Sequence, residues 1–186
     1  MPPLVVIGQC YFTYILAQGP DGLYIIDQHA AHERIMYEKF KRSYEEGGVQ
    51  SQKLLTPLVV ELSNEEFIIV KENLDIITKL GFEVDFFGNN SVVLRSVPMI
   101  FGVPQLKKLF LEVVAELQNG GSTTKNTIDN AIYTMACRSA VKANDRLDKK
   151  EMDGIIKQLR ETVNPYTCPH GRPTIIKLTQ TELEKK

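Results

Sequence analysis

An α+β fold with two lobes is predicted by the arrangement of apolar residues along the chain. Short apolar runs of strand type open the sequence, helices with apolar residues at three- and four-residue spacing follow, and a last apolar run precedes the tail. Residues 58–124 have a helix, strand, strand, helix pattern of their own. We therefore expect a main lobe built from 1–57 and 125–186, which carries both termini, and a smaller inserted α/β lobe.

The first third of the chain predicts a strand, a hairpin and a helix. Residues 4–7 form a short apolar run, and residues 11–17 and 23–27 flank Gly-Pro-Asp-Gly, a strong turn signal. A helix is expected from Gln28 to about Tyr44, followed by a connector over 49–57.

The inserted lobe and the last third also contain clear helix boundaries. Ser63 and Glu66 form a capping-box pattern before a helix that reaches Leu80, and two strands and a second helix follow to Leu117. A polar linker separates this lobe from a long helix expected over 126–144. Asp148 begins another capping box, and a strand is expected at 174–178, before a charged tail.

Composition limits the classes of function. The chain has 186 residues, 43% hydrophobic and 24% charged, with a net charge of −1, so no overall basic field attracts it to nucleic acid. Three cysteines without framework spacing predict a reduced, intracellular protein. No apolar run approaches the ~20 residues of a membrane span, and no signal peptide is evident. Met1, which leads directly into a strand, suggests a start within a longer protein.

Metal-ligand chemistry is concentrated in two stretches that lie far apart in the sequence. In the first, Asp27 and His29 are two residues apart at a strand end and face the same side. His29 and Glu33 are four apart and share one face of the following helix. Glu38 lies about 140° round that helix from Glu33, so we expect it to support the metal ligands or the fold, and not to bind the same metal as Glu33.

The second stretch is the sequence Cys-Pro-His-Gly-Arg-Pro at 168–173, which can present a thiolate and an imidazole together. Thiolate, imidazole and carboxylate ligands suit a zinc-type ion better than magnesium. With Cys137, the candidates exceed one tetrahedral site but fall short of two closed sites. A bridging carboxylate would allow two metals ~3.5–4 Å apart, as used for phosphoester cleavage. A closed structural zinc is the alternative.

Several candidates have simpler structural interpretations. Asp27 is a suitable N-cap, and this role can coexist with metal chemistry. His32 is expected to be structural, Cys10 to be a core residue, and Cys137, taken alone, is typical of a buried helical cysteine.

Basic residues predict possible phosphate contacts. Arg138, Lys142 and Arg146 recur at four-residue spacing, so they form either a solvated ridge or a DNA-binding ridge. Arg172 is either a contact to the scissile phosphate or part of a structural ion pair.

These motifs together resemble the C-terminal domain of the MutL family of DNA mismatch repair, in its endonuclease-bearing form. The family motifs are Asp-Gln-His-Ala-x2-Glu-x4-Glu, Ala-Cys-Arg and Cys-Pro-His-Gly-Arg-Pro, and they are met in order at 27–38, 136–138 and 168–173. The resemblance covers nearly the whole chain.

The resemblance implies a latent metal-dependent endonuclease that nicks one strand of duplex DNA, with Asp27 and Glu33 in catalytic roles. The implied metal ligands are Asp27, His29, Glu33, Cys137, Cys168 and His170. One or two Zn²⁺ ions, structural or regulatory, are implied, with Mn²⁺ supporting catalysis and ATP acting through an N-terminal domain absent from this chain.

The resemblance also implies partners and a location. A homodimer is expected through the lobe that carries both termini, with 58–124 as an external regulatory lobe. Double-stranded DNA, the replication sliding clamp and, through the full-length chain, a mismatch-recognition protein are the expected partners. The expected location is the bacterial cytoplasm, in association with the nucleoid and not with a membrane.

A hexapeptide in the connector resembles the motif by which bacterial members of the family dock on the sliding clamp. Gln52 would fill a polar pocket and Leu54 and Leu55 an apolar one, with Pro57 ending the motif. The structural alternative is a strand lead-in stopped by the proline. A second hypothesis for the whole chain is therefore a non-catalytic dimerisation and clamp-binding module with a structural zinc.

Overall fold

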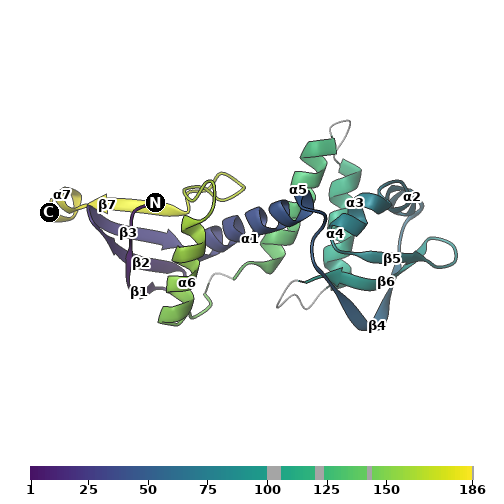
Figure 1. The fold of residues 1–186 in the computed structure, drawn as a ribbon, viewed down its shortest axis with the longest axis horizontal. Helices are drawn as coiled ribbons and strands as arrows, with labels where there is room; N and C mark the ends of the chain where they lie inside the picture. The colour runs from purple at the N-terminus through teal and green to yellow at the C-terminus, as the bar shows by residue number, and fades with distance from the viewer. Residues whose placement is uncertain (100–105, 120–123, 142–143, 186) are drawn as a thin grey trace. The chain divides into compact units, whose positions relative to one another are not determined.

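The computed structural model of the chain describes residues 1–99, 106–119, 124–141 and 144–185. Helices and antiparallel sheets are both present, so the predicted α+β class is confirmed (Figure 1). In chain order the elements are β1 (Val5–Cys10), β2 (Tyr14–Gly19), β3 (Gly22–Asp27), α1 (Gln28–Glu45), β4 (Ser51–Glu61), α2 (Asn64–Glu72), α3 (Leu74–Lys79), β5 (Glu83–Phe86), β6 (Ser91–Pro98), α4 (Leu106–Asn119), α5 (Thr124–Ser139), α6 (Lys149–Arg160), β7 (Ile175–Thr179) and α7 (Gln180–Glu184).

Contacts divide the chain into two compact units. Unit 1 comprises residues 1–38 and 140–186, and unit 2 comprises residues 39–139. These bounds differ from the predicted lobe boundaries after residues 57 and 124. The difference arises because β4 pairs with β6 and α5 packs against α4, which places both elements in unit 2.

Unit 1 is built on an antiparallel sheet in the order β1-β2-β3-β7. The predicted hairpin is present, with Gly19 paired to Gly22 at its turn. Gly22 has φ +149°, and a Cβ at this position would lie 2.1 Å from the Leu178 carbonyl oxygen, so only glycine fits. The C-terminal strand β7 adds to β3, so the two ends of the chain meet in one sheet.

One face of this sheet forms the core of unit 1. Ile15 and Ile26 are fully buried there against Ile35 of α1 and Leu159 of α6. Burial of each such side chain contributes about 1.5–3 kcal/mol. The core therefore holds α1 and α6 against the same face of the sheet.

Unit 2 has a sheet in the order β4-β6-β5, with a core that includes Leu94, Phe82 and Phe110. The two phenylalanine rings meet edge to face with centroids 5.4 Å apart. The single helix predicted up to Leu80 is instead two helices. Asn73 separates them because its backbone leaves the helical conformation, with φ −113° and ψ 24°, while its N–H and its side-chain amide both donate to the Ile69 carbonyl.

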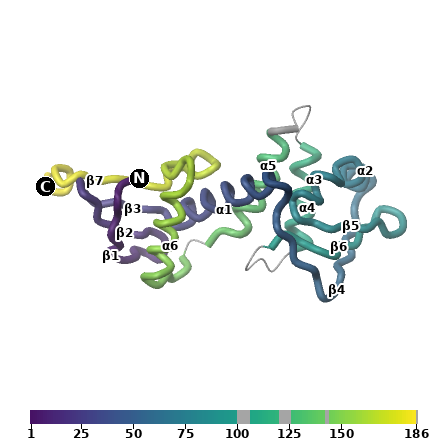
Figure 2. Tube along the Cα trace, viewed as in Figure 1, coloured from purple at the N-terminus to yellow at the C-terminus, as the bar shows by residue number. Residues whose placement is uncertain are grey.

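The predicted connector over 49–57 is wrong for most of its length, because β4 starts at Ser51. Its ladder to β6 breaks between Lys53 and Leu58, where four residues of β4 oppose one residue of β6. Such a bulge bends the strand, and Figure 2 shows the chain turning sharply along β4.

The helix predicted over 126–144 ends early, at Ser139. The Ser139 hydroxyl donates to the Ala136 carbonyl, 2.9 Å away, and the Val141 N–H donates to a histidine ring instead of continuing the helical ladder. Near the C-terminus, part of the predicted charged tail forms the short helix α7. Among the described helices, none has the length and apolar character needed to cross a membrane.

Candidate metal centre

The carboxylate of Glu33 is the centre of the polar cluster in unit 1. Glu33 lies on α1 and is 2% exposed. Its Oε1 is 3.2 Å from Nε2 of His29, and its Oε2 is 3.1 Å from Nη2 of Arg172 and 3.8 Å from Nδ1 of His170. A buried carboxylate is costly unless cationic or hydrogen-bonding groups surround it. The Glu33 carboxylate therefore joins α1 to the loop at 168–173.

His29 is oriented by a backbone carbonyl. Its Nδ1 is 2.9 Å from the Val141 carbonyl oxygen, and only an N–H can bond to that acceptor. The proton therefore sits on Nδ1, and Nε2 faces Glu33. This N–H to carbonyl bond is the arrangement that commonly orients metal-binding histidines.

The loop at 168–173 presents His170 through a tight turn. The Gly171 N–H donates to the Cys168 carbonyl at 2.9 Å, and the Cys168 N–H donates to the Arg172 carbonyl at 2.8 Å. Gly171 has φ +82°, the left-handed conformation that glycine adopts most easily. Cys168 is buried, whereas the imidazole of His170 is about half exposed.

Arg172 is engaged within the cluster. Its guanidinium bonds Glu33 and also the Cys168 side chain, and the Cys168 contact is the larger cause of its raised pKa. Of the two predicted interpretations of Arg172, the structure therefore contains the ion pair. A contact to phosphate remains a prediction.

Asp27 ends β3 and caps α1. Its Oδ1 accepts from the Ala30 N–H at 2.9 Å, and its own N–H donates to the Thr174 carbonyl at 2.9 Å. The N-cap interpretation is thus observed. The negative charge of Asp27 also contributes to the environment of His29, where it helps to raise the imidazole pKa.

His32 has a structural role, as predicted, although the sequence did not indicate its partner. Its Nδ1 accepts from the Val141 N–H at 2.8 Å, so His29 and His32 together bond both polar groups of Val141. The three-residue spacing of the two histidines places them on one helix face, and this spacing was the only feature of the sequence that indicated a shared role. Their shared backbone partner could not be predicted, since it lies more than a hundred residues away in the sequence.

The remaining candidates belong to other elements of the chain. Cys137 is half-buried on α5 in unit 2, whereas the other five implied ligands belong to unit 1. Arg138 pairs with Glu112, whose Oε2 is 2.7 Å from the arginine Nε. Arg146 is exposed in unit 1, beyond the end of α5, so one continuous helical ridge does not form. Lys142 lies outside the described residues, and Cys10 is half-buried at the end of β1.

The two cluster histidines are expected to titrate on opposite sides of the ordinary value in the metal-free protein. The hydrogen bond to Glu33 raises the pKa of His29 above 6.5, whereas desolvation lowers the pKa of His170 below 6.5. NMR titration of the imidazole signals measures both. In Glu33→Gln the midpoint of His29 should fall and that of His170 should change less, because Glu33 is the first cause only for His29. Equal shifts of both would contradict this arrangement.

Comparison with known proteins places this geometry in a family. The model of the MutL C-terminal dimerisation domain matches residues 7–147. A DNA mismatch repair protein MutL of Clostridium botulinum (strain Loch Maree / Type A3) is 50% identical over 182 residues, which are 97% of this chain and 27% of the relative. MutL proteins of Clostridium acetobutylicum and Clostridium tetani are 48% and 45% identical, and each alignment covers 100% of this chain and 30% of the relative.

The chain thus spans between a quarter and a third of the length of these relatives. The family model covers most of the residues that build the sheet of unit 1 and α1, and the relatives match the loop at 168–173 as well. The chain belongs to the MutL C-terminal dimerisation domain family.

Proposed function

We propose that this chain is a metal-dependent DNA endonuclease domain that nicks one strand of duplex DNA in mismatch repair. The observation that carries the proposal is the buried Glu33 carboxylate, with His29 and His170 directed at its two oxygens. This arrangement places imidazole nitrogens and a carboxylate at one point, beside the α1 cap formed by Asp27.

The donor set fits a zinc-type divalent ion. His29, Glu33 and His170 supply nitrogen and oxygen ligands, Cys168 supplies a buried thiol in the same loop, and Cys137 is a further candidate from unit 2. A divalent ion bound there would supply Lewis-acid activation of water and of a phosphoryl oxygen. Glu33, His29 and His170 would hold the ion, and Asp27 would accept a proton from water.

Metal content and nicking test the proposal together. Elemental analysis of the purified chain should find zinc, and supercoiled plasmid should be converted to the open circle when Mn²⁺ and the sliding clamp are present. Because the chain has a net charge of −1, we expect weak DNA binding and slow nicking without the clamp. Chelation with EDTA should stop nicking. Bound zinc without nicking, even with the clamp, would favour the non-catalytic dimerisation and clamp-binding module.

A homodimer is part of the proposed function, and the sheet of unit 1 supplies its surface. Each of the four strands places at least one apolar residue on the face opposite the core. Val5 and Ile176 are 67% and 53% exposed on it, and Leu16, Ile25 and Leu178 are half-buried. An apolar sheet face of this extent is typical of a protein interface. We infer that a second copy of the chain covers it, which agrees with the dimerisation role in the family's name.

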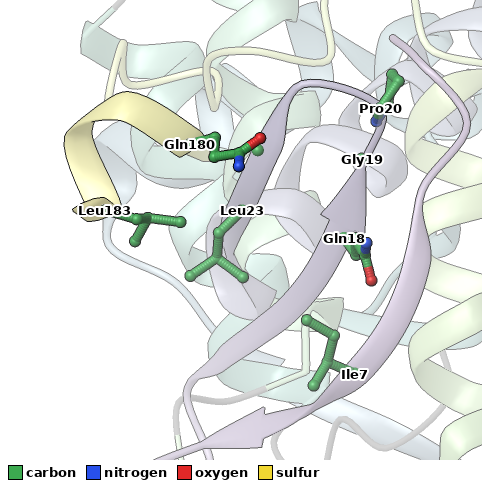
Figure 3. A pocket seen from close by; sticks show the side chains of 8 residues that line it. Ile7, Gln18, Gly19, Pro20, Leu23, Gln180 and Leu183 are labelled. Atoms are coloured by element: carbon green, nitrogen blue, oxygen red, sulfur yellow. The ribbon is translucent and has the colours of Figure 1, made fainter.

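A shallow pocket lies at one end of this surface (Figure 3). It has a volume of about 340 Å³ and is lined by Ile7 of β1, Leu23 of β3 and Leu183 of α7, among others. An apolar side chain of the second copy would fit this lining. The pocket therefore extends the proposed interface to the C-terminal helix.

Docking on the sliding clamp is supported by the bulge in β4. Leu55 is fully exposed at 105%, and Gln52 and Pro57 are also exposed, although they belong to a paired strand. The bulge releases residues 54–57 from the ladder, whereas Gln52, Lys53 and Leu58 remain paired to β6. Leu55 is thus presented to solvent between paired residues in unit 2, and Leu54 beside it is half-buried.

Replacement of Leu54 and Leu55 by alanine is expected to weaken clamp binding at least about tenfold, or about 1.4 kcal/mol. The loss arises because the two side chains would enter an apolar pocket. Surface plasmon resonance on an immobilised bacterial sliding clamp measures the affinity. Val59→Ala, which removes a half-exposed apolar side chain from the same strand, is the matched control and should bind as the wild type. Equal losses in both variants would argue against the motif.

A further inference from the structure

The segment from Val163 to Thr174 runs antiparallel along the first half of α1. Its start is bonded to Glu38, its middle to Arg34, its loop to Glu33 and its end to the Asp27 backbone. All of these contacts lie within unit 1. α1 therefore holds the segment that carries Cys168 and His170 at three successive places, and the last residue of β3 holds its end.

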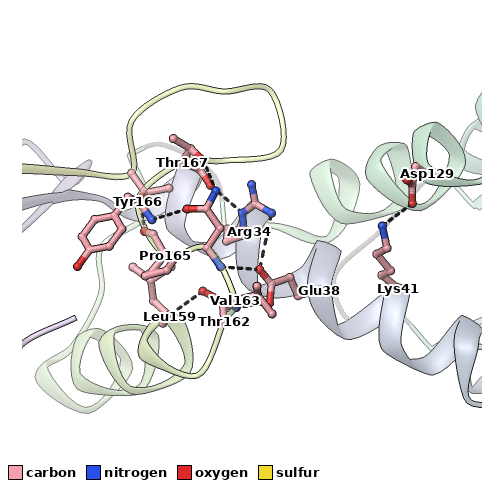
Figure 4. Close-up of polar contacts among 12 residues, drawn as sticks. Arg34, Glu38, Lys41, Asp129, Leu159, Thr162, Val163, Pro165, Tyr166 and Thr167 are labelled. Carbon is pink, nitrogen blue, oxygen red and sulfur yellow. Dashed lines mark hydrogen bonds and ion pairs between the residues drawn. The ribbon is translucent and has the colours of Figure 1, made fainter. Parts of the chain in front are cut away.

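Glu38 makes the first of these contacts. Its two carboxylate oxygens accept from the N–H groups of Val163 and Asn164, at 2.7 and 3.3 Å (Figure 4). The guanidinium of Arg34 lies 3.7 Å from the same carboxylate. Both oxygens of Glu38 are thus used by the backbone and by Arg34, with neither directed at Glu33 or His170.

Arg34 makes the second contact. Its Nε donates to the Thr167 carbonyl at 2.7 Å, one residue before Cys168. The side chain of Asn164 also donates to the Thr167 hydroxyl at 2.8 Å, which closes the turn between the two contacts (Figure 4). Arg34 and Glu38 therefore bond the segment at both ends of this turn, immediately ahead of the loop.

From this geometry we propose that Glu38 and Arg34 are positioning residues for the metal centre: they fix the 163–167 turn on α1 and thereby hold Cys168 and His170 against Glu33, without binding metal themselves. The inference rests on the proposed metal-dependent function. It assigns the second glutamate of the α1 motif a role distinct from that of Glu33. Groups that orient metal ligands typically change metal affinity about 10–100-fold when they are removed.

Zinc affinity and amide exchange test the proposal in the whole chain. Glu38→Ala should weaken zinc binding about 10–100-fold in competition with a chromophoric chelator. Hydrogen exchange of Val163 and Asn164 should accelerate in the metal-free variant, because their acceptor is lost. With Co²⁺ at saturation, the absorption spectrum should match the wild type, since the ligand set is unchanged. Glu38→Gln retains one acceptor oxygen and should give an intermediate zinc affinity, which also covers the case in which Glu38→Ala fails to fold.

The matched control is Lys41→Met, which removes an ion pair from the same helix. Lys41 bonds Asp129 at 2.9 Å, and both residues belong to unit 2 (Figure 4). Its zinc affinity should equal that of the wild type.

Three outcomes would overturn the inference alone. A changed Co²⁺ spectrum at saturation in Glu38→Gln would make Glu38 a ligand. Faster amide exchange of Val163 and Asn164 in Glu38→Ala, with an unchanged zinc affinity, would show that Glu38 supports the turn but does not position the metal ligands. Zinc binding weakened equally in Lys41→Met would show a general loss of stability. Failure of the wild type to bind zinc would instead overturn the proposed function itself, and the inference with it.

Discussion

Replacement of Asp27 by asparagine is expected to lower plasmid nicking by at least about 100-fold, the usual contribution of a positioned proton acceptor. The fold should survive, because the structural work of Asp27 is done by Oδ1, which accepts from the Ala30 N–H at 2.9 Å. Asparagine keeps that oxygen and is itself a preferred N-cap. The substitution therefore removes the charge without removing the helix cap.

Asp27→Ala provides the matched comparison. It should lose nicking to the same extent and also about 1 kcal/mol of stability, because the cap is lost. Thermal unfolding followed by circular dichroism separates the two variants, and plasmid nicking in Mn²⁺ with the clamp gives the activity. Asp27→Asn with wild-type nicking would contradict a catalytic Asp27. Loss of folding together with loss of zinc would favour the structural-zinc hypothesis.

The double substitution Val5→Glu and Ile176→Glu is expected to convert the dimer to a monomer. Both residues lie on the outer face of the unit 1 sheet, and a two-fold interface would contain each substitution twice. Unpaired carboxylates buried in an apolar interface should raise the dissociation constant at least about 100-fold, or about 2.7 kcal/mol. Both side chains are exposed in one chain, so its fold should be preserved.

Sedimentation velocity over a range of concentrations measures this change. Val59→Glu is the control, because Val59 is likewise half exposed on a sheet, but in unit 2. It should leave the dimer intact. If Val59→Glu dissociates the dimer and the double variant does not, the interface belongs to unit 2 and the proposed surface is wrong.

Elements with local signals could be predicted from the sequence. The hairpin turn at Gly19–Gly22 and the capping boxes of Ser63 and Asp148 each depend on residues within four positions of one another, and all are present. The strand β4 was missed because a proline and a bulge interrupt its apolar pattern. Its pairing depends on β6, some forty residues further along the chain.

In the candidate site, too, local features could be predicted from the sequence and long-range contacts could not. The ligand types and the face shared by His29 and Glu33 followed from spacing. The partners of His29, His32, Glu38 and Arg172 did not, because each contact joins residues more than a hundred positions apart. Such contacts depend on the tertiary fold, which brings distant segments together, and short sequence motifs do not determine it.

The pairing of β3 with β7 has a consequence for the order of folding. Ile25 and Ile176 are partners although about 150 residues separate them, and closing a flexible loop of that length costs roughly 4 kcal/mol. Unit 2 is continuous in sequence and can fold first. Its Lys41–Asp129 ion pair then brings together two points close to its own ends. Early folding of unit 2 would thus shorten the open loop, so that the sheet of unit 1, and the metal centre with it, is completed last.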